Sequence, residues 1–325
     1  MKLKHIATIG LALAPTAAFA GPAINGAGAT FPAPIYQRWF QDYANASGNR
    51  VNYQSVGSGA GVRQFVAGTV DFGATDEPIK TKEAAKVKRG VIQIPMVGGT
   101  IAVAYNKPGC KLKLTQKQTV HIFSGHIKDW KEVGCAAGKM VVVHRSDGSG
   151  TTFAFTNSLD AFGGWTPGVG KSVNWPTGVG AKGNEGVSGT IKNTPGAIGY
   201  VNTGFVRPNK LQAAVLQNKA GNFVGPSAVT GAAALNGIKV DPVTLAGEDP
   251  NPAGAKAYPI STLTWILAYK SGYADGKAGA VRDALNYALS GKAQGLADDL
   301  GYVPLSGSIL NKARLKVKQV GLGEK

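Results

Sequence analysis

Short apolar runs of strand length alternate along this chain with segments whose apolar residues recur at helical spacing. Chains with this alternation form α/β folds, in which helices cover a sheet. Several of the runs are apolar throughout, which is typical of parallel strands buried on both faces. The expected strands span residues 51–56, 91–97, 101–105, 140–144, 197–201 and 265–269.

Three helices are predicted from the same pattern. They are expected at residues 34–46, about 60–67 and 151–161. One face of the first helix carries four aromatic side chains: Tyr36, Trp39, Phe40 and Tyr43. Because the apolar residues of each helix form a single stripe, we expect all three to pack on the core. The 325 residues suffice for about two domains.

Each predicted helix follows a turn rich in glycine and small polar residues, and these turns place hydroxyl groups near the helix starts. The hydroxyls belong to Thr30, Ser58, Ser149 and Thr151. Helix N-termini bind anions through unpaired N–H groups, and glycine lets an anion approach the main chain. Arg145, in the third turn, can hold an oxyanion with two N–H groups. Taken singly, each turn also fits a capped helix start, and Arg145 also fits a surface ion pair with Asp147.

The motifs of phosphate-handling enzymes are missing from the sequence. It has no G-x-x-x-x-G-K-[ST] segment, which disfavours a P-loop nucleotidase, and no G-x-S-x-G segment around the serines of these turns. His144 is expected to end a buried strand rather than to act as a general base. We therefore expect a binding protein rather than an enzyme, with a secreted phosphatase-like hydrolase as the alternative.

The chain is strongly basic, with a formal net charge of +17. This charge favours anionic partners in general. Basic residues gather at 80–89 and 312–318, but no aromatic residues are interleaved with them. Such clusters are typical of solvated faces, so no nucleic-acid partner is expected.

The first twenty residues have the features of a cleavable export signal. Lys2 and Lys4 precede an apolar stretch at residues 6–14, and Ala18-Phe19-Ala20 fits a cleavage site before Gly21. The apolar stretch is too short to span a membrane, and no cysteine follows the cleavage site to carry a lipid. We expect the mature protein to be exported without a lipid anchor.

The two cysteines, Cys110 and Cys135, are expected to form a structural disulfide, because an exported protein folds in an oxidising compartment. His121 and His126 lie between them in the sequence, so a zinc site is the alternative to a disulfide. The spacing matches none of the usual zinc patterns, so no metal site is predicted.

Four segments of this sequence are similar to the signature segments of one protein family. They are GAGATFPAP at residues 26–34, VDFGATD at 70–76, RSDGSGT at 145–151 and PGAIGY at 195–200. Residues 175–186 and 258–265 extend the similarity, which runs in order through nearly the whole chain after residue 20. The sequence thus resembles the periplasmic phosphate-binding proteins of phosphate-specific (Pst) ABC transporters.

The resemblance implies a type II periplasmic-binding-protein fold, with two α/β lobes joined by two crossovers and a ligand cleft between them. Lobe 1 would comprise residues 21–97 and 258–325, and lobe 2 residues 98–257. The implied function is high-affinity binding of inorganic phosphate in the periplasm and its delivery to the permease and ATPase complex of the transporter. A monomer without a cofactor is expected. Binding of another tetrahedral oxyanion is the nearest alternative.

The resemblance also implies which residues contact phosphate. They are Thr30, Phe31 (through its backbone N–H), Ser58, Asp76, Arg145, Asp147, Ser149, Gly150 and Thr151. Asp76 is expected to accept a hydrogen bond from the P–O–H group, which phosphate has and sulfate lacks at neutral pH. The chain departs from many relatives at Gly59-Ala60, where Ser-Gly is frequent, and at Thr75, where serine is common.

Overall fold

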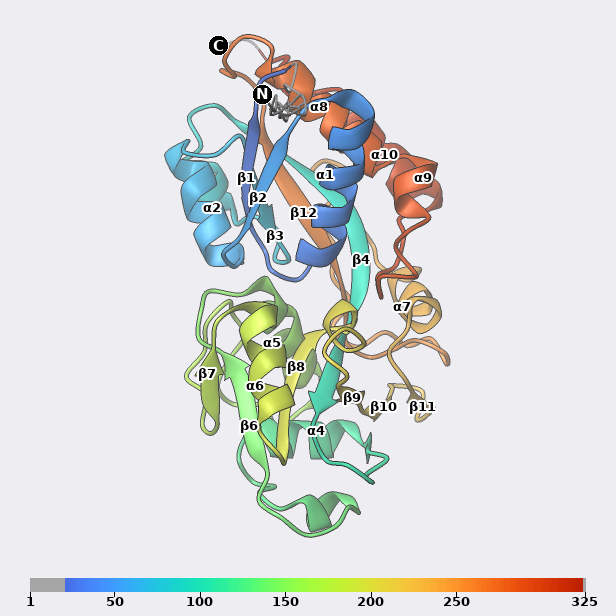
Figure 1. The fold of residues 1–325 in the computed structure, drawn as a ribbon. Coiled ribbons are helices and arrows are strands. Elements are labelled where there is room, and N and C mark those ends of the chain that lie inside the picture. Colours follow the sequence, from blue (N-terminus) through green and yellow to red (C-terminus); the bar gives the residue numbers. More distant parts are fainter. Residues whose placement is uncertain (1–20, 324–325) are drawn as a thin grey trace, which may run out of the picture.

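The computed structural model describes residues 21–323 (Figure 1). The strands are β1 (Ile24–Gly28), β2 (Val51–Ser55), β3 (Phe72–Thr75), β4 (Val91–Tyr105), β5 (Lys113–Leu114), β6 (Val141–Arg145), β7 (Val179–Ala181), β8 (Ala197–Asn202), β9 (Gln212–Ala213), β10 (Val215–Gln217), β11 (Phe223–Val224) and β12 (Ser261–Tyr269). The α-helices are α1 (Ala33–Ser47), α2 (Ser58–Ala67), α3 (Thr81–Ala84), α4 (Gln116–Phe123), α5 (Gly150–Phe162), α6 (Gly183–Asn193), α7 (Ala228–Leu235), α8 (Lys277–Ala288), α9 (Gly291–Gln294) and α10 (Gly307–Val317), and the short 3-10 helices are η1 (Trp130–Val133) and η2 (Thr203–Phe205). The expected export signal, residues 1–20, lies outside the described range. Within that range, no helix is long and apolar enough to cross a membrane.

One long strand, β4, joins two halves of a mixed sheet with the order β2-β1-β3-β12-β4-β8-β6-β7. Val91 to Thr100 of β4 pair with β12, whereas Ile101 to Tyr105 pair with β8. We call β2, β1, β3 and β12 the first half-sheet, and β8, β6 and β7 the second. Figure 1 shows β4 running from one half into the other. The two strands predicted at 91–97 and 101–105 are therefore one, because pairing with the start of β12 keeps the intervening Gly98-Gly99-Thr100 extended.

The predicted α/β class is confirmed, but the expectation that the apolar runs are parallel strands is wrong for β4 and β12. These two strands pair antiparallel with each other, and β12 also pairs antiparallel with β3. Both strands are buried along almost their whole length. Their continuous apolar runs therefore indicate burial on both faces of the sheet and do not indicate whether the strands are parallel or antiparallel. Pro95 lies inside β4, beside a register shift at Thr264/Trp265. A bulge of this kind accommodates a residue that has no N–H to donate to the ladder.

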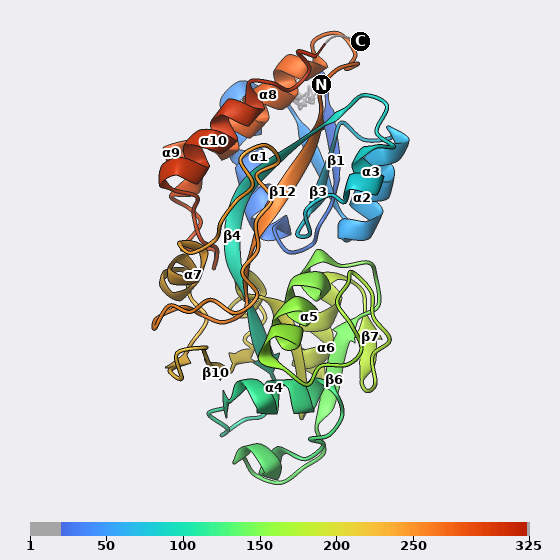
Figure 2. The same cartoon turned by 180° about the vertical axis from the view of Figure 1, so that it is seen from behind.

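Helices cover both faces of the two half-sheets. Figures 1 and 2 show α1, α8 and α10 on one face of the first half-sheet and α2 on the other. The aromatic stripe predicted on α1 is buried, with Trp39 and Tyr36 fully so, and the indole N–H of Trp39 donates to the carbonyl of Ala293 at 2.7 Å. In the second half-sheet, Val187 and Ile191 of α6 pack on one face, and α4 and α5 cover the other. The chain is therefore organised as two layered α/β units around one shared strand.

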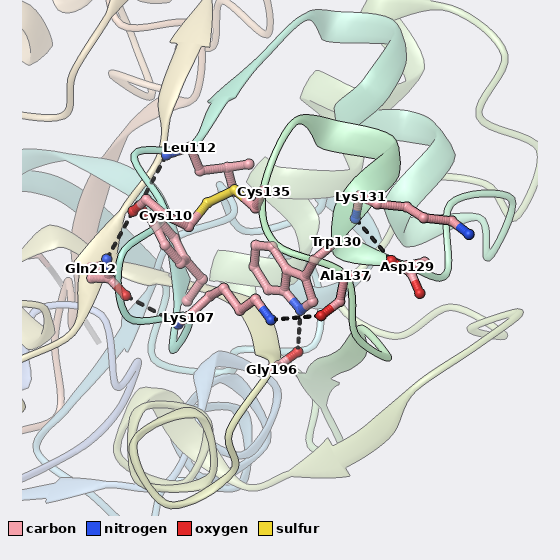
Figure 3. The surroundings of a disulfide bond; sticks show 11 residues. Lys107, Cys110, Leu112, Asp129, Trp130, Lys131, Cys135, Ala137, Gly196 and Gln212 are labelled. Atoms are coloured by element: carbon pink, nitrogen blue, oxygen red, sulfur yellow. Dashed lines mark hydrogen bonds between the residues drawn. A yellow bond between two sulfur atoms is a disulfide. The ribbon is translucent and has the colours of Figure 1, made fainter.

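The predicted disulfide between Cys110 and Cys135 is confirmed, with Cα atoms 5.4 Å apart (Figure 3). It lies beside the buried Trp130, whose indole N–H donates to the carbonyl of Gly196 at 3.0 Å. The disulfide ties the segment after β4 to the loop that follows η1. Among residues 21–323, no group of three or more metal-ligating side chains comes together, and the nearby His121 and His126 rings are 5.3 Å apart.

Candidate functional site

The ends of both half-sheets meet where the three glycine-rich turns lie. Helix α2 begins at Ser58, three residues after β2, and α5 begins at Gly150, five residues after β6. Thr30 lies between β1 and α1. Parallel strands place their carboxyl ends at the same edge of a sheet, which is where ligands bind in open α/β folds. All of the predicted polar side chains at this junction except Asp147 are almost completely buried: Thr30, Ser58, Asp76, Arg145, Ser149 and Thr151.

Asp76 lies at the centre of this junction and is 1% exposed. Its Oδ1 accepts a hydrogen bond from the hydroxyl of Thr264 at 2.8 Å, and its Oδ2 accepts from Thr151 at 3.3 Å and Ser58 at 3.5 Å. Burial raises the pKa of Asp76 to about 7, although these hydroxyls and the nearby Arg145 oppose the shift. At neutral pH the carboxyl can therefore accept or carry a proton.

Arg145 supplies the positive charge of the site. Its Nε and Nη2 donate to the two carboxylate oxygens of Asp147 at 2.7 and 2.6 Å, and its Nη1 lies 3.5 Å from the hydroxyl of Thr151. The Arg145 side chain is only 1% exposed and that of Asp147 13%, so this is not the surface ion pair of the alternative interpretation. Burial raises the pKa of Asp147, but its hydrogen bonds with Arg145 and the backbone N–H of Gly183 bring it below its usual range. Asp147 thus fixes the guanidinium in one orientation.

The N-terminus of α5 faces Asp76 and Ser58. Ser149 caps the helix by accepting the N–H of Thr152 at 3.0 Å, so the capping interpretation holds for this turn. The N–H of Gly150 donates to the hydroxyl of Ser58 at 3.0 Å. A Cβ at Gly150 would lie 2.7 Å from Ser58 Oγ and from the backbone N of Asp76, so only glycine permits this approach.

Phe31 is placed by a contact with the C-terminal part of the chain. Its ring packs edge-on against Tyr302 with centroids 6.0 Å apart, and the hydroxyl of Tyr302 donates to the Phe31 carbonyl at 2.7 Å. The Phe31 side chain is fully buried. These contacts hold the main chain beside Thr30 in position at the end of β1.

Two polar residues of the site, Asn184 and Thr264, were not among the predicted contacts. Asn184 is fully buried at the start of α6, and its N and Nδ2 donate to the hydroxyl of Thr30 at 3.0 and 2.8 Å. Its Nδ2 also lies 3.2 Å from the hydroxyl of Thr151. Both residues belong to segments that carry the family resemblance, 175–186 and 258–265, so a search of those segments for small polar side chains would have found them.

Thr75 and Gly59, where the chain departs from many relatives, and His144 all lie near the site. The hydroxyl of Thr75 donates to the carbonyl of Glu77 at 2.7 Å and so shapes the turn after Asp76. Gly59 approaches the other half-sheet, where its N–H donates to the carbonyl of Gly148 at 2.8 Å. His144 lies next to the end of the largely buried strand β6, as expected, but its own side chain is only half-buried, and its ring stacks on Trp175 with centroids 5.0 Å apart.

This arrangement combines hydroxyl and amide groups with one guanidinium and one buried carboxyl. The donors come from segments on both half-sheets, and contacts such as Gly150 to Ser58 and Asn184 to Thr30 connect the two. Hydroxyls and N–H groups that converge in a buried space can bind an oxyanion without a full counter-charge. A carboxyl among them adds an acceptor for a protonated oxygen.

Comparison with known proteins agrees with this geometry. Residues 14–292 match the PBP superfamily domain. The chain is 40% identical over 312 residues to the phosphate-binding protein PstS of Pasteurella multocida, covering 91% of this chain and 90% of that protein. It is also 40% identical over 314 residues to PstS of Haemophilus influenzae, covering 91% and 92%.

Solved structures show the same fold. A high-affinity periplasmic phosphate-binding protein bound with phosphate has a TM-score of 0.77 at 24% identity, covering 90% of this chain and 93% of that one. A phosphate-binding protein from Stenotrophomonas maltophilia has a TM-score of 0.75 at 21% identity, covering 91% and 94%. The expected periplasmic-binding-protein fold is confirmed.

Proposed function

The chain belongs to the PstS family of phosphate-binding proteins within the PBP superfamily, and we propose that it binds inorganic phosphate at the buried site around Asp76 and Arg145. The proposed contacts are Thr30, Phe31, Ser58, Asp76, Arg145, Asp147, Ser149, Gly150 and Thr151, with Asn184 and Thr264 orienting the hydroxyls and the carboxyl. The protein acts as a binding protein and not as an enzyme.

The observation that carries this proposal is the buried Asp76 carboxyl among hydroxyl donors, one of which, Thr151, also contacts the guanidinium of Arg145. Phosphate carries at least one proton at neutral pH, and a carboxylate accepts a hydrogen bond from that P–O–H group. Fully ionised sulfate has no such proton. Its oxygen and the Asp76 carboxylate oxygen would both be hydrogen-bond acceptors, and the negative charges of the two groups would repel each other. Sites that pair with a ligand hydroxyl reject ligands without it by several orders of magnitude.

The two half-sheets and their helices form the two lobes of the proposed binding protein. We assign residues 21–97 and 258–325 to lobe 1 and residues 98–257 to lobe 2, because the chain passes between the half-sheets along β4 and again before β12. The phosphate contacts come from both lobes, so closure of the lobes would bury the ligand.

The proposed setting is the periplasm, where the protein would capture phosphate and deliver it to the permease and ATPase of an ABC transporter. This part of the proposal rests on family membership and on the export signal expected from the sequence. The mature protein would act as a monomer.

Calorimetric titration of the phosphate-stripped protein, starting at Gly21, tests the proposal. We expect tight binding of one phosphate per chain and no comparable binding of sulfate. A chromogenic phosphate ester should release no phosphate in the presence of the protein. Absence of phosphate binding, or equal affinity for sulfate, would show that the site recognises another ligand.

A further inference from the structure

An ion pair that is largely shielded from solvent connects the two lobes outside the anion site. Lys171 lies in the loop between α5 and β7, and its Nζ is 2.8 Å from Oε2 of Glu77. Glu77 belongs to lobe 1 and directly follows Asp76, whereas Lys171 belongs to lobe 2. The Glu77 side chain is 4% exposed and that of Lys171 is 14% exposed.

Both partners are tied to the backbone of the site. The carbonyl of Lys171 accepts the N–H of Ser149, the residue that caps α5, at 2.9 Å. On the other side, Thr75 fixes the turn that carries Glu77, because its hydroxyl donates to the Glu77 carbonyl and accepts the Glu77 N–H. If Lys171 and Glu77 move apart, Ser149 at the start of α5 therefore moves away from Asp76.

Other charged groups lie close to the pair, among them Glu248 of lobe 2, whose pKa is raised to about 7 by desolvation and by the charge of Glu77. Lys80 approaches the other oxygen of Glu77 at 3.2 Å, and Lys171 is 3.6 Å from Oε1 of Glu83. Buried charges are costly without a partner, and loss of one member of a buried pair is strongly destabilising. When the lobes separate, a charge without its partner can be hydrated, so loss of one member of the pair specifically penalises the state in which the lobes are closed.

We propose that the Lys171–Glu77 ion pair holds the lobes closed and thereby slows the release of phosphate. This inference rests on the proposed function, since the ligand it retains is the one bound at Asp76 and Arg145. Lys171 and Glu77 act as positioning residues, because the contacts described above link them to the backbone of the site and to each other.

A simpler effect of Lys171, attraction of the anion by its positive charge, makes a different prediction for Glu77. Removing the negative charge of Glu77 would then strengthen phosphate binding. If the ion pair instead holds the lobes together, both Lys171→Met and Glu77→Gln weaken binding, because each leaves the pair unmade. The sign of the effect of Glu77→Gln therefore separates the two explanations.

The experiment measures phosphate affinity and the phosphate dissociation rate for the wild type, Lys171→Met, Lys171→Arg and Glu77→Gln. We expect Lys171→Met and Glu77→Gln each to weaken affinity by about tenfold or more, mainly through faster dissociation. Lys171→Arg, which keeps the charge, should lose less. Small-angle scattering of the ligand-free proteins should give a larger radius of gyration for Lys171→Met than for the wild type.

Lys277→Met is the matched control, because Lys277 Nζ pairs with Asp71 at 2.8 Å entirely within lobe 1. It should leave phosphate affinity unchanged. Tighter binding by Glu77→Gln, affinities of both variants within about twofold of the wild type, or an equal loss in Lys277→Met would overturn the proposal. If the wild type bound no phosphate, the proposed function would fail, and the scattering comparison would still decide whether the pair holds the lobes together.

Discussion

Asp76 Oδ1 accepts a hydrogen bond from the hydroxyl of Thr264 at 2.8 Å, across 188 positions of the sequence. Thr264 lies on β12, whose register against β4 shifts at this point. The strand that completes the first half-sheet thus also orients the central carboxyl of the site. With Oδ1 engaged in this way, Oδ2 faces the hydroxyls of Thr151 and Ser58.

Replacing Asp76 by asparagine should reduce the preference for phosphate over sulfate. The amide can donate a hydrogen bond to a fully ionised oxygen and carries no charge, so the rejection of sulfate is relieved. Calorimetry of the Asp76→Asn variant with both anions measures the ratio of affinities. Asp71→Asn, in the same lobe, serves as the control. An unchanged ratio would show that proton matching at Asp76 does not set selectivity.

The same variant should alter how the stability of the ligand-free protein depends on pH. Burial raises the pKa of Asp76 from 3.8 to about 7, so the folded state holds the proton more tightly than the unfolded state. This group therefore costs stability increasingly as pH rises from about 4 to about 7, and the cost is constant above that. The free energy of unfolding of Asp76→Asn, compared with that of the wild type, should therefore be higher at about pH 8.5 than at about pH 5. The change in this difference between the two pH values should be about 3 kcal/mol. Denaturant unfolding at both pH values measures the difference, and an equal effect at both would contradict the raised pKa.

Arg145 should be required for phosphate affinity, and lysine should not replace it. Both carboxylate oxygens of Asp147 bind the guanidinium, which a single ammonium cannot reproduce. Arg145→Ala should weaken phosphate binding by more than about tenfold, or ~1.4 kcal/mol, and Arg145→Lys should not restore it. Titration of the variants with phosphate tests this, with Arg89→Lys, a cation placed over the Tyr269 ring in lobe 1, as the control. Wild-type affinity of Arg145→Ala would refute the assignment.

Much of this arrangement could be predicted from the sequence, and the parts that could not share a physical reason. The turns at Thr30, Ser58 and Ser149 carry local signals, because glycine and small hydroxyl residues directly precede helical patterns. By contrast, the direction of β12 and the contact of Thr264 with Asp76 depend on pairing between distant segments. Local periodicity records how deeply a strand is buried but carries no information on its partner.

Asn184 should contribute to phosphate affinity although it follows none of the three predicted turns. It donates to the hydroxyl of Thr30 through both N and Nδ2, which leaves that hydroxyl free to direct its own proton toward a ligand. Asn184→Ala should weaken phosphate binding by about tenfold. Asn106→Ala removes a comparable amide whose Nδ2 donates to the carbonyls of Ile191 and Lys192, within lobe 2. Calorimetry of both variants should show a loss of affinity for Asn184→Ala alone, and equal losses would assign the effect to general destabilisation.

The disulfide should stabilise the protein without affecting the anion site. Cys110 and Cys135 are separated by 25 positions, and closing a loop of that size removes unfolded-state entropy worth about 3 kcal/mol. The bridge joins the segment after β4 to the loop after η1, and none of the residues labelled around it in Figure 3 belongs to the proposed phosphate contacts. The double variant Cys110→Ala/Cys135→Ala should therefore unfold at lower denaturant concentration while keeping wild-type phosphate affinity. A weakened affinity at temperatures well below the unfolding transition would show that the bridge also positions the site.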